Sequence, residues 1–348
     1  MAVLKPASIR EVAARAGVSV ATVSNAVRGR KRVTPEVAAR VHEAVAALHY
    51  QADRAAAQLR SGKARVVAIL VPSLENPFFT SLIAILERRA QAAGYDIIVA
   101  SAGDDVGTER TRLLALFSWR PAGIVILPCS DTFPSRPILE AAHVPYVVVD
   151  RLADEPGADL IAVDNHAAAA AAAHHLLALG HRRLLVVASS LALANIRERW
   201  DGIRAQCLDA GIGAPELLEV GLTFETVSGE LEQWLGRHER PTAIIALTNF
   251  TTLGVMAALR DTGLAVPGDV SLVGYDDYAW MRAASPPITA VRQPVELMGG
   301  QAWSCLMRRI EGDTAPFQSI RLAGELQLRL STAPLRTRGN NRNHRKKT

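Results

Sequence analysis

Short polar side chains gather on one predicted helix near the start of the chain, and a run of basic residues follows it. Val23 and Val27 lie four residues apart and predict the buried face of a helix that runs to about residue 27. The outward positions of this helix are Val20, Ala21, Thr22, Ser24 and Asn25. The basic run contains Arg28, Arg30, Lys31 and Arg32. Hydroxyl, amide and guanidinium groups in this arrangement suit hydrogen bonding to a nucleic acid.

Helix signals on either side position this surface. Ser8 and Glu11 have the spacing of a capping box, which predicts a helix from residue 9 that ends at Gly17. Ser19 can cap the second helix after a short turn. Thr34, directly before a proline, predicts the start of a third helix with apolar residues every three or four positions. Three short helices with a tight first turn are typical of a helix-turn-helix module.

The net charge of +5 is unevenly distributed along the 348 residues. Residues 1–65 carry a net charge of +8 and residues 336–348 carry +6, which leaves −9 on the body between them. A basic head on an acidic body is expected when only the head meets a polyanion. The tail lacks acidic residues and is expected to be disordered.

The composition also excludes several classes of protein. Three distant cysteines without a CxxC spacing exclude a disulfide scaffold and a recognisable zinc site. No apolar stretch is long enough to span a bilayer and no secretory signal precedes the head, so we expect a cytoplasmic protein. His174 and His175 are adjacent on a predicted helix and point about 100° apart, which does not make a metal site. Phosphate-loop, nucleophile-elbow and zinc-protease motifs are absent, so no catalytic residue, metal or cofactor is predicted.

After residue 63 short apolar runs alternate with helical stretches. The runs lie at 66–71, 95–100, 123–127, 146–149, 160–163, 184–188, 243–247 and 271–274. Runs rich in valine and isoleucine predict buried parallel strands, and their alternation with helices predicts an α/β fold with right-handed crossovers. About 270 residues exceed one such sheet, so we predict two doubly wound lobes.

The head has a specific resemblance. The sequence IREVAARAGVSVATVSNAV at 9–27, with VTPEV at 33–37 and LHY at 48–50, resembles the DNA-binding start of the lactose-repressor/galactose-repressor (LacI/GalR) transcription factors. The resemblance implies that Val20, Ala21 and Asn25 contact base edges in the major groove, where Asn25 can pair with an adenine. Phosphate contacts are expected from Thr22, Ser24, Arg28 and Arg32. The alternative for Asn25 is a solvated surface amide.

A short helical pattern at 53–60 follows the head at the family's spacing. A helix of this length is marginal in water and needs a partner to be ordered. Ala56 and Leu59 share one face of it, and in the resembled family the residue matching Leu59 is inserted into a minor-groove step. The alternative is an ordinary linker helix whose leucine packs on the body.

Nearly the whole chain shares the resemblance, which implies a core like the periplasmic sugar-binding proteins with a ligand between its lobes. We expect a helix-turn-helix domain at 1–50, a hinge at 51–63 and a core at 64–335. Lobe 1 would span 64–164 and 292–323, and lobe 2 would span 165–291 and 324–335. Strand ends facing the cleft supply the expected effector contacts, which are Phe78, Phe79, Asp150, Arg151, Asn195, Arg199, Phe224, Asn249 and Asp276. Arg199 opposite Asp276 suits a polyhydroxy ligand, with a structural ion pair as the alternative; for Phe78 and Phe79 the alternative is core packing.

The sequence therefore predicts a homodimeric, sequence-specific regulator that binds a pseudo-palindromic DNA operator. A repressor is favoured over an activator. A small-molecule effector in the cleft, a sugar or a sugar derivative, would control its affinity. Two alternatives stay open at this point. One is a doubly wound sugar- or nucleotide-processing enzyme with a fused head, and the other is an architectural protein that binds DNA without sequence preference.

Overall fold

The computed structural model describes residues 7–27, 33–50, 65–151 and 157–335. It divides into two units, residues 1–65 and 66–348, and each is described by itself. Several predicted features lie outside the described residues: Arg28 and Arg32 of the basic run, Ala56 and Leu59 of the hinge, and the tail at 336–348.

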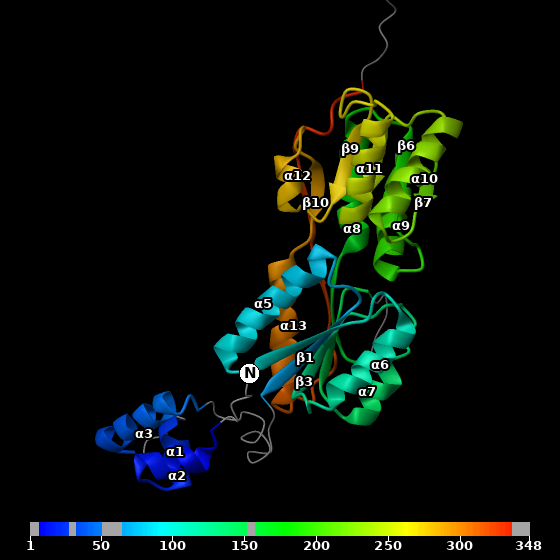
Figure 1. Cartoon of the computed structure of the whole chain (residues 1–348). Helices are drawn as coiled ribbons and strands as arrows, with labels where there is room; N and C mark the ends of the chain where they lie inside the picture. Colours follow the sequence, from blue (N-terminus) through cyan, green and yellow to red (C-terminus); the bar gives the residue numbers. More distant parts are fainter. Residues whose placement is uncertain (1–6, 28–32, 51–64, 152–156, 336–348) are drawn as a thin grey trace, which may run out of the picture. The chain divides into compact units, whose positions relative to one another are not determined.

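The first unit contains three short helices, α1 (Ile9–Ala16), α2 (Val20–Val27) and α3 (Pro35–Ala47) (Figure 1). The capping box at the start of α1 is present, and the helix ends at Gly17 with φ of 64°. Glycine adopts this left-handed conformation without the steric cost of a side chain, so the turn to α2 can be tight. Val12, Val23 and Val41, one from each helix, are fully buried and form the centre of a small core. The predicted helix-turn-helix head is confirmed.

The second unit begins with a sheet of order β11-β5-β4-β3-β1-β2, in which every neighbouring pair is parallel. Its strands are β1 (Val66–Val71), β2 (Asp96–Ser101), β3 (Gly123–Ile126), β4 (Tyr146–Val149), β5 (Asp159–Val163) and β11 (Ser319–Leu322). Four helices cover it: α5 (Pro77–Ala93), α6 (Val106–Phe117), α7 (Arg136–Ala142) and α13 (Val295–Ile310). Val67, Ile69 and Val71 pack with α5 and α13, whereas Ala68 and Leu70 pack with α6 and α7. Alternation along β1 thus buries both faces of the sheet (Figure 1).

The second sheet has the order β12-β10-β9-β8-β6-β7, and β12 alone among its described strands pairs antiparallel. Its strands are β6 (Leu184–Ala188), β7 (Glu216–Glu219), β8 (Ala243–Ala246), β9 (Ser271–Tyr275), β10 (Thr289–Arg292) and β12 (Glu325–Gln327). Its helices are α8 (Asn165–Ala178), α9 (Ala194–Asp209), α10 (Phe224–Arg237), α11 (Asn249–Asp261) and α12 (Ala279–Ala283). The two lobes repeat one strand order, and the chain passes between the described sheets after β5, after β10 and after β11. The predicted pair of doubly wound lobes is confirmed.

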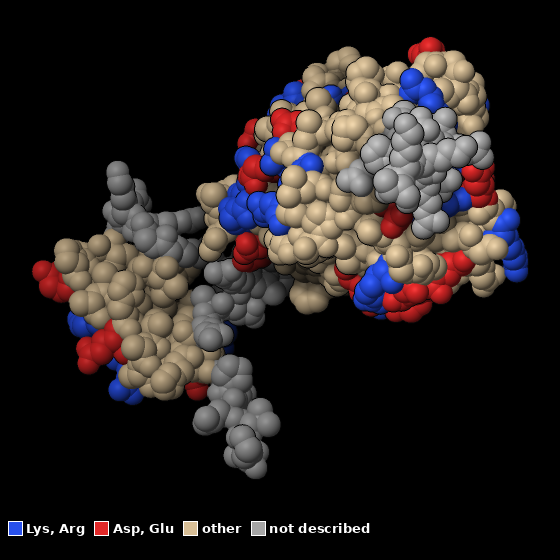
Figure 2. Space-filling model, turned by 90° about the horizontal axis from the view of Figure 1, so that it is seen from above, with Lys and Arg blue, Asp and Glu red and all other residues tan. Residues whose placement is uncertain are grey.

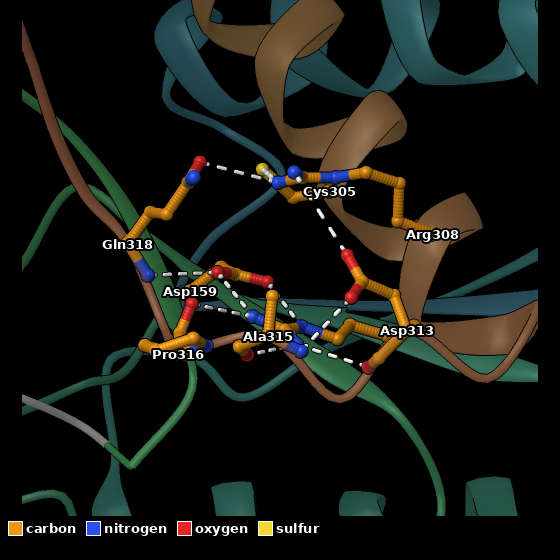
Figure 3. A network of polar contacts seen from close by, with 8 residues as sticks. Asp159, Cys305, Arg308, Asp313, Ala315, Pro316 and Gln318 are labelled. Carbon is orange, nitrogen blue, oxygen red and sulfur yellow. Dashed lines mark hydrogen bonds and ion pairs between the residues drawn. The ribbon is translucent and has the colours of Figure 1, made fainter.

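A closed network of polar contacts joins α13 to the first sheet (Figure 3). Asp159, the first residue of β5, is fully buried and is held by the Arg309 guanidinium through Nε at 2.8 Å and Nη2 at 3.0 Å. The backbone N–H of Gln318 donates to the same carboxylate at 2.9 Å. Burial alone would raise the pKa of Asp159, but these hydrogen bonds outweigh it and the pKa is lowered. The network anchors the segment that leads into β11.

Candidate ligand cleft and nucleic-acid interface

A cleft of about 730 Å³ lies between the two lobes, at the carboxyl ends of strands from both sheets. Open parallel sheets bind ligands at this edge. Eight of the nine predicted effector residues line it: Phe78, Phe79, Asp150, Arg151, Asn195, Arg199, Phe224 and Asp276. The cleft is also lined by Ser73, Leu74, Glu75, Asn76, Ser101, Gly103, Asp104, Ser189, Leu193, Ile196, Leu222, Thr223, Glu225, Thr248, Phe250 and Gln293.

Two aspartates occupy equivalent places in the two lobes. Asp150 follows β4 and Asp276 follows β9, each the third strand of its sheet order. Their φ values are 77° and 83°, and their backbone N–H groups donate to Ile161 and Val291 of the next strands. A residue other than glycine in this left-handed region costs about 1–3 kcal/mol of strain, which clusters at functional sites. The repeat aims one carboxylate from each lobe into the cleft.

The two carboxylates differ in their partners. Asn195 donates from Nδ2 to Asp150 Oδ2 at 2.9 Å, and the other oxygen has no hydrogen-bond partner among the described residues. Asp276 accepts from the backbone N–H of Asn249 at 2.8 Å and from Nε2 of Gln293. Burial raises the pKa of both aspartates, and the positive charge of Arg199 opposes that rise.

Arg199 is held rigidly within lobe 2. It is 2% exposed, and its Nε and Nη1 donate to Asn165 Oδ1 at 2.8 Å and to the Leu247 carbonyl at 2.7 Å. Its guanidinium stacks on Tyr275, with Cζ 3.8 Å from the ring centroid. Helix α9 can bring it there because Gly202 lacks a side chain where α9 meets the His166 carbonyl at the start of α8. In the described part of the protein Arg199 and Asp276 form neither a hydrogen bond nor an ion pair, so the expected contact between them is electrostatic only.

Helix α2 presents the predicted DNA-contacting side chains at the surface of the first unit. Ala21 is exposed, and Val20, Thr22, Ser24 and Asn25 are half-buried. Ser19 accepts from the backbone N–H of Thr22 at 3.1 Å and so caps the helix as predicted. The first turn of α2 has no acidic residue, which leaves its positive end available to a phosphate. Acidic and basic side chains are interspersed on the faces of both units that Figure 2 shows.

One prediction about α2 was wrong. Val27 was placed on the buried face, but it is 37% exposed, whereas Ala26 is buried beside Val23. The buried pair is therefore spaced three residues apart, and Val20 leans against the same small core. An eight-residue helix offers a narrow buried stripe, and the small Ala26 lets the helices approach closely.

Comparison with known proteins decides the family. Residues 8–53 match the model of bacterial regulatory proteins of the lacI family, and residues 173–332 match the model of a periplasmic binding protein-like domain. The ribose operon repressor of Escherichia coli is 30% identical over 320 residues, which cover 91% of this chain and 97% of the relative. The chain belongs to the LacI family.

Solved structures of this family have the same fold as the chain. A lac repressor dimer bound to operator and the anti-inducer ONPF matches with a TM-score of 0.85 and 26% identity, and covers 94% of this chain and 100% of that one. A complex of the transcriptional regulator CelR with cellobiose matches with a TM-score of 0.72 and 28% identity over 93% of this chain and 99% of that one. This LacI-family member is a DNA-binding transcriptional regulator, and its core has the fold of the periplasmic binding proteins.

Aromatic side chains line part of the cleft. Phe78 and Phe79 are 4% and 2% exposed and belong to the core of the first lobe, yet both also line the cleft. Arg151 lies over the Phe79 ring, 5.2 Å from its centroid, and pairs with Asp104 at 2.8 Å. Phe224 is 39% exposed and offers an apolar face at the mouth.

Asn249 is the predicted effector residue that does not line the cleft. Its side-chain oxygen accepts from Trp280 Nε1 at 2.9 Å, and its backbone N–H donates to Asp276. Asn249 therefore positions the Asp276 carboxylate through its backbone N–H, outside the cleft lining. Gln293 and Asp104, which sequence reasoning missed, do line the cleft. Gln293 follows β10, a short strand that ends in an exposed arginine and was not recognised as apolar; recognising it would have identified Gln293 as a strand-end residue.

No group of three His, Cys, Asp or Glu side chains in the described ranges could hold a metal ion. His175 instead bonds to Thr332 and His181 to the Ala333 carbonyl, which are structural contacts. None of the helices that the structure describes is long and apolar enough to cross a membrane.

Proposed function

We propose that this LacI-family chain is a repressor that binds a pseudo-palindromic operator as a homodimer and responds to a sugar or sugar derivative in its cleft. The observation that carries the proposal is the paired cleft, with one strained aspartate from each lobe turned inward. The related structures support both halves of it, since one is a dimer bound to operator and another a complex with cellobiose. We further infer that the chain is not an enzyme and acts in the cytoplasm, because the relative that covers most of it is named a repressor.

On the DNA side, we assign base contacts to Val20, Ala21 and Asn25 of α2. Ala21 is the most accessible of them, and the amide of Asn25 can donate and accept at an adenine edge. Thr22 and Ser24 would bind phosphate groups, together with Arg28 and Arg32. Ala56 and Leu59 would contact the minor groove. One head contacts only a few base pairs, so two heads are needed for a specific site.

Effector binding between the lobes would change how far they close. The described lobes already meet at an ion pair, in which Arg197 of α9 lies 2.6 Å from Asp131 in the loop after β3. A ligand that binds one closure state better shifts the equilibrium toward it and thereby changes operator affinity. A thousandfold change requires about 4 kcal/mol of difference between the states.

The test is selection of DNA sites from a random pool by the full-length protein, repeated with sugars, sugar acids and purines. We expect a symmetric consensus whose affinity changes with one class of ligand. Asn25→Ala should relax the preference at one base pair in each half-site by about 1–3 kcal/mol. A diffuse binding pattern, steep in salt and unresponsive to every ligand, would instead support an architectural DNA-binding protein.

A further inference from the structure

Two buried acceptors in the cleft have no donor among the described residues. They are Oδ1 of Asp150, a residue that is 3% exposed, and Oε1 of Gln293, a residue that is 6% exposed. Both residues line the cleft, and their other polar atoms are already fixed by Asn195 and Asp276. A buried acceptor without a donor costs free energy, so a ligand that fits here must bring hydrogen-bond donors.

The guanidinium groups of the cleft are already engaged. Arg151 is paired with Asp104 and lies over Phe79. Arg199 donates from two of its three nitrogens to Asn165 and Leu247. A carboxylate or phosphate is bound most strongly by a free, bidentate guanidinium. Arg199 cannot offer one without breaking a contact that it already makes, and the charge of Arg151 is already paired with Asp104.

The charge of the cleft also opposes an anion. Its described lining contains five carboxylates and two guanidinium groups, and it contains no lysine or histidine. Glu75 and Glu225 are exposed at this lining, where an entering anion would meet them first. Deeper in, the positive charge of Arg199 acts on both Asp150 and Asp276 and offsets part of their negative charge, so the acidic character of the lining is weakest beside Arg199.

We propose, on the basis of the proposed function, that the effector is an uncharged polyhydroxy compound. Its hydroxyl groups donate to Asp150 Oδ1 and Gln293 Oε1, which neither a carboxylate nor a phosphate can do because these groups only accept. Together with the acidic lining, this requirement discriminates against aldonates and sugar phosphates built on the same carbon skeleton, because their charged group cannot donate where the hydroxyl that it replaces can.

The experiment uses the full-length protein and matched ligands, with binding measured by calorimetry and by the shift in Tm. The probes are D-ribose with ribose 5-phosphate, and D-glucose with gluconate, glucose 6-phosphate and glucosamine. Cellobiose, xylitol and hypoxanthine complete the panel. We expect a neutral polyol to bind, with a Kd at least tenfold lower than that of any charged counterpart.

Three variants test the assigned atoms. Asp150→Asn and Gln293→Leu should each raise the Kd of the bound polyol at least tenfold. The double variant Glu75→Gln/Glu225→Gln should narrow the gap between neutral and anionic ligands. Glu311→Gln removes one carboxylate charge from an exposed position at the end of α13 and should change neither the Kd nor this gap.

The outcomes separate the inference from the proposed function. Tighter binding of an anion or of glucosamine would overturn the inference, as would a Kd unaffected by Asp150→Asn. Binding of hypoxanthine without any polyol would also overturn it, yet an effector-controlled regulator would remain. Loss of the proposed function itself would appear in the DNA selection as the absence of a consensus site.

Discussion

Two buried aspartates nine positions apart, Asp159 and Asp150, have opposite environments in the same lobe. Asp159 is the first residue of β5, at the amino ends of the strands. Arg309 and Gln318 donate hydrogen bonds to its two oxygens. Asp150 follows β4, at the carboxyl ends of the strands. One of its oxygens accepts a hydrogen bond from Asn195, and the other has no partner among the described residues. The pKa of Asp159 is lowered, whereas the pKa of Asp150 is raised.

The difference distinguishes a structural carboxylate from one kept for a ligand. A buried charge is stable when hydrogen bonds and a counter-ion complete its surroundings, as for Asp159. At Asp150 the protein leaves these incomplete and holds the backbone at a strained φ of 77°. Burial by itself therefore does not distinguish these two aspartates; the incomplete set of partners at Asp150 does.

The largest effect that tests this comparison should come from Arg309→Met. Removing the guanidinium leaves Asp159 buried and uncompensated, so we expect about 3–5 kcal/mol of destabilisation in urea unfolding. Arg308→Met is the matched control, since Arg308 is 42% exposed and its ion pair with Asp313 is 3.9 Å long. That control should lose less than about 1 kcal/mol. Equal losses in the two variants would show that the Asp159 network is not a stabilising pair.

Much of this architecture could be predicted from the sequence because its signals are local. Fully apolar runs such as β1 and β6 are buried on both faces and stand out in any chain. The capping box at Ser8 and the turn at Gly17 fix the head through neighbouring residues alone. Four strands were missed. Three of them, β7, β11 and β12, are edge strands, with half-exposed, mixed sequences that periodicity does not separate from loops. The fourth, β10, lies inside its sheet but has only four residues and ends in an exposed arginine.

The cleft was harder to predict in detail because its hydrogen bonds join distant segments. Asn249 begins helix α11 shortly after strand β8, at a place where a ligand residue is expected, but its partner Trp280 lies 31 residues away. The Asp159 network was missed for the same reason, since Arg309 is 150 residues from its partner. Residue types and spacing give the edge of the sheet at which a site forms, whereas tertiary contacts decide which side chains remain available there.

The second prediction concerns pH, because the two aspartates should affect stability with opposite signs. Asp159 has a lowered folded pKa, so its contribution is present above the ordinary value of about 3.9 and is lost as the pH falls through the folded value. Asp150 has a raised folded pKa, so the folded state is favoured below about 3.9 and loses stability as the pH rises through the folded value. Relative to Asp159→Asn, the native protein should gain stability with rising pH; relative to Asp150→Asn, it should lose stability.

Urea unfolding of the three proteins between about pH 3 and pH 8 measures both slopes over the range in which the carboxyl groups titrate. Asp105→Asn is a useful control, because Asp105 caps α6 at the surface and its pKa is lowered by the Thr108 hydrogen bond. It should follow the sign of Asp159. Parallel profiles for Asp150→Asn and Asp159→Asn would refute the distinction drawn between the two aspartates.

The smallest effect is expected at a third carboxylate, Asp131, whose ion pair with Arg197 is partly exposed and joins the two lobes. An exposed pair contributes at most about 1 kcal/mol and is screened by salt, so it adjusts lobe closure without fixing it. Arg197→Gln should weaken ligand binding by less than about fivefold and reduce the dependence of the ligand Kd on salt. Arg204→Gln is the control, since Arg204 pairs with Asp201 within α9 itself. The salt dependence of the ligand Kd could instead be the same in the native protein and in Arg197→Gln. Lobe closure would then depend on the buried cleft residues alone, and the contrast between Asp150 and Asp159 would account for the ligand response without the ion pair between Arg197 and Asp131.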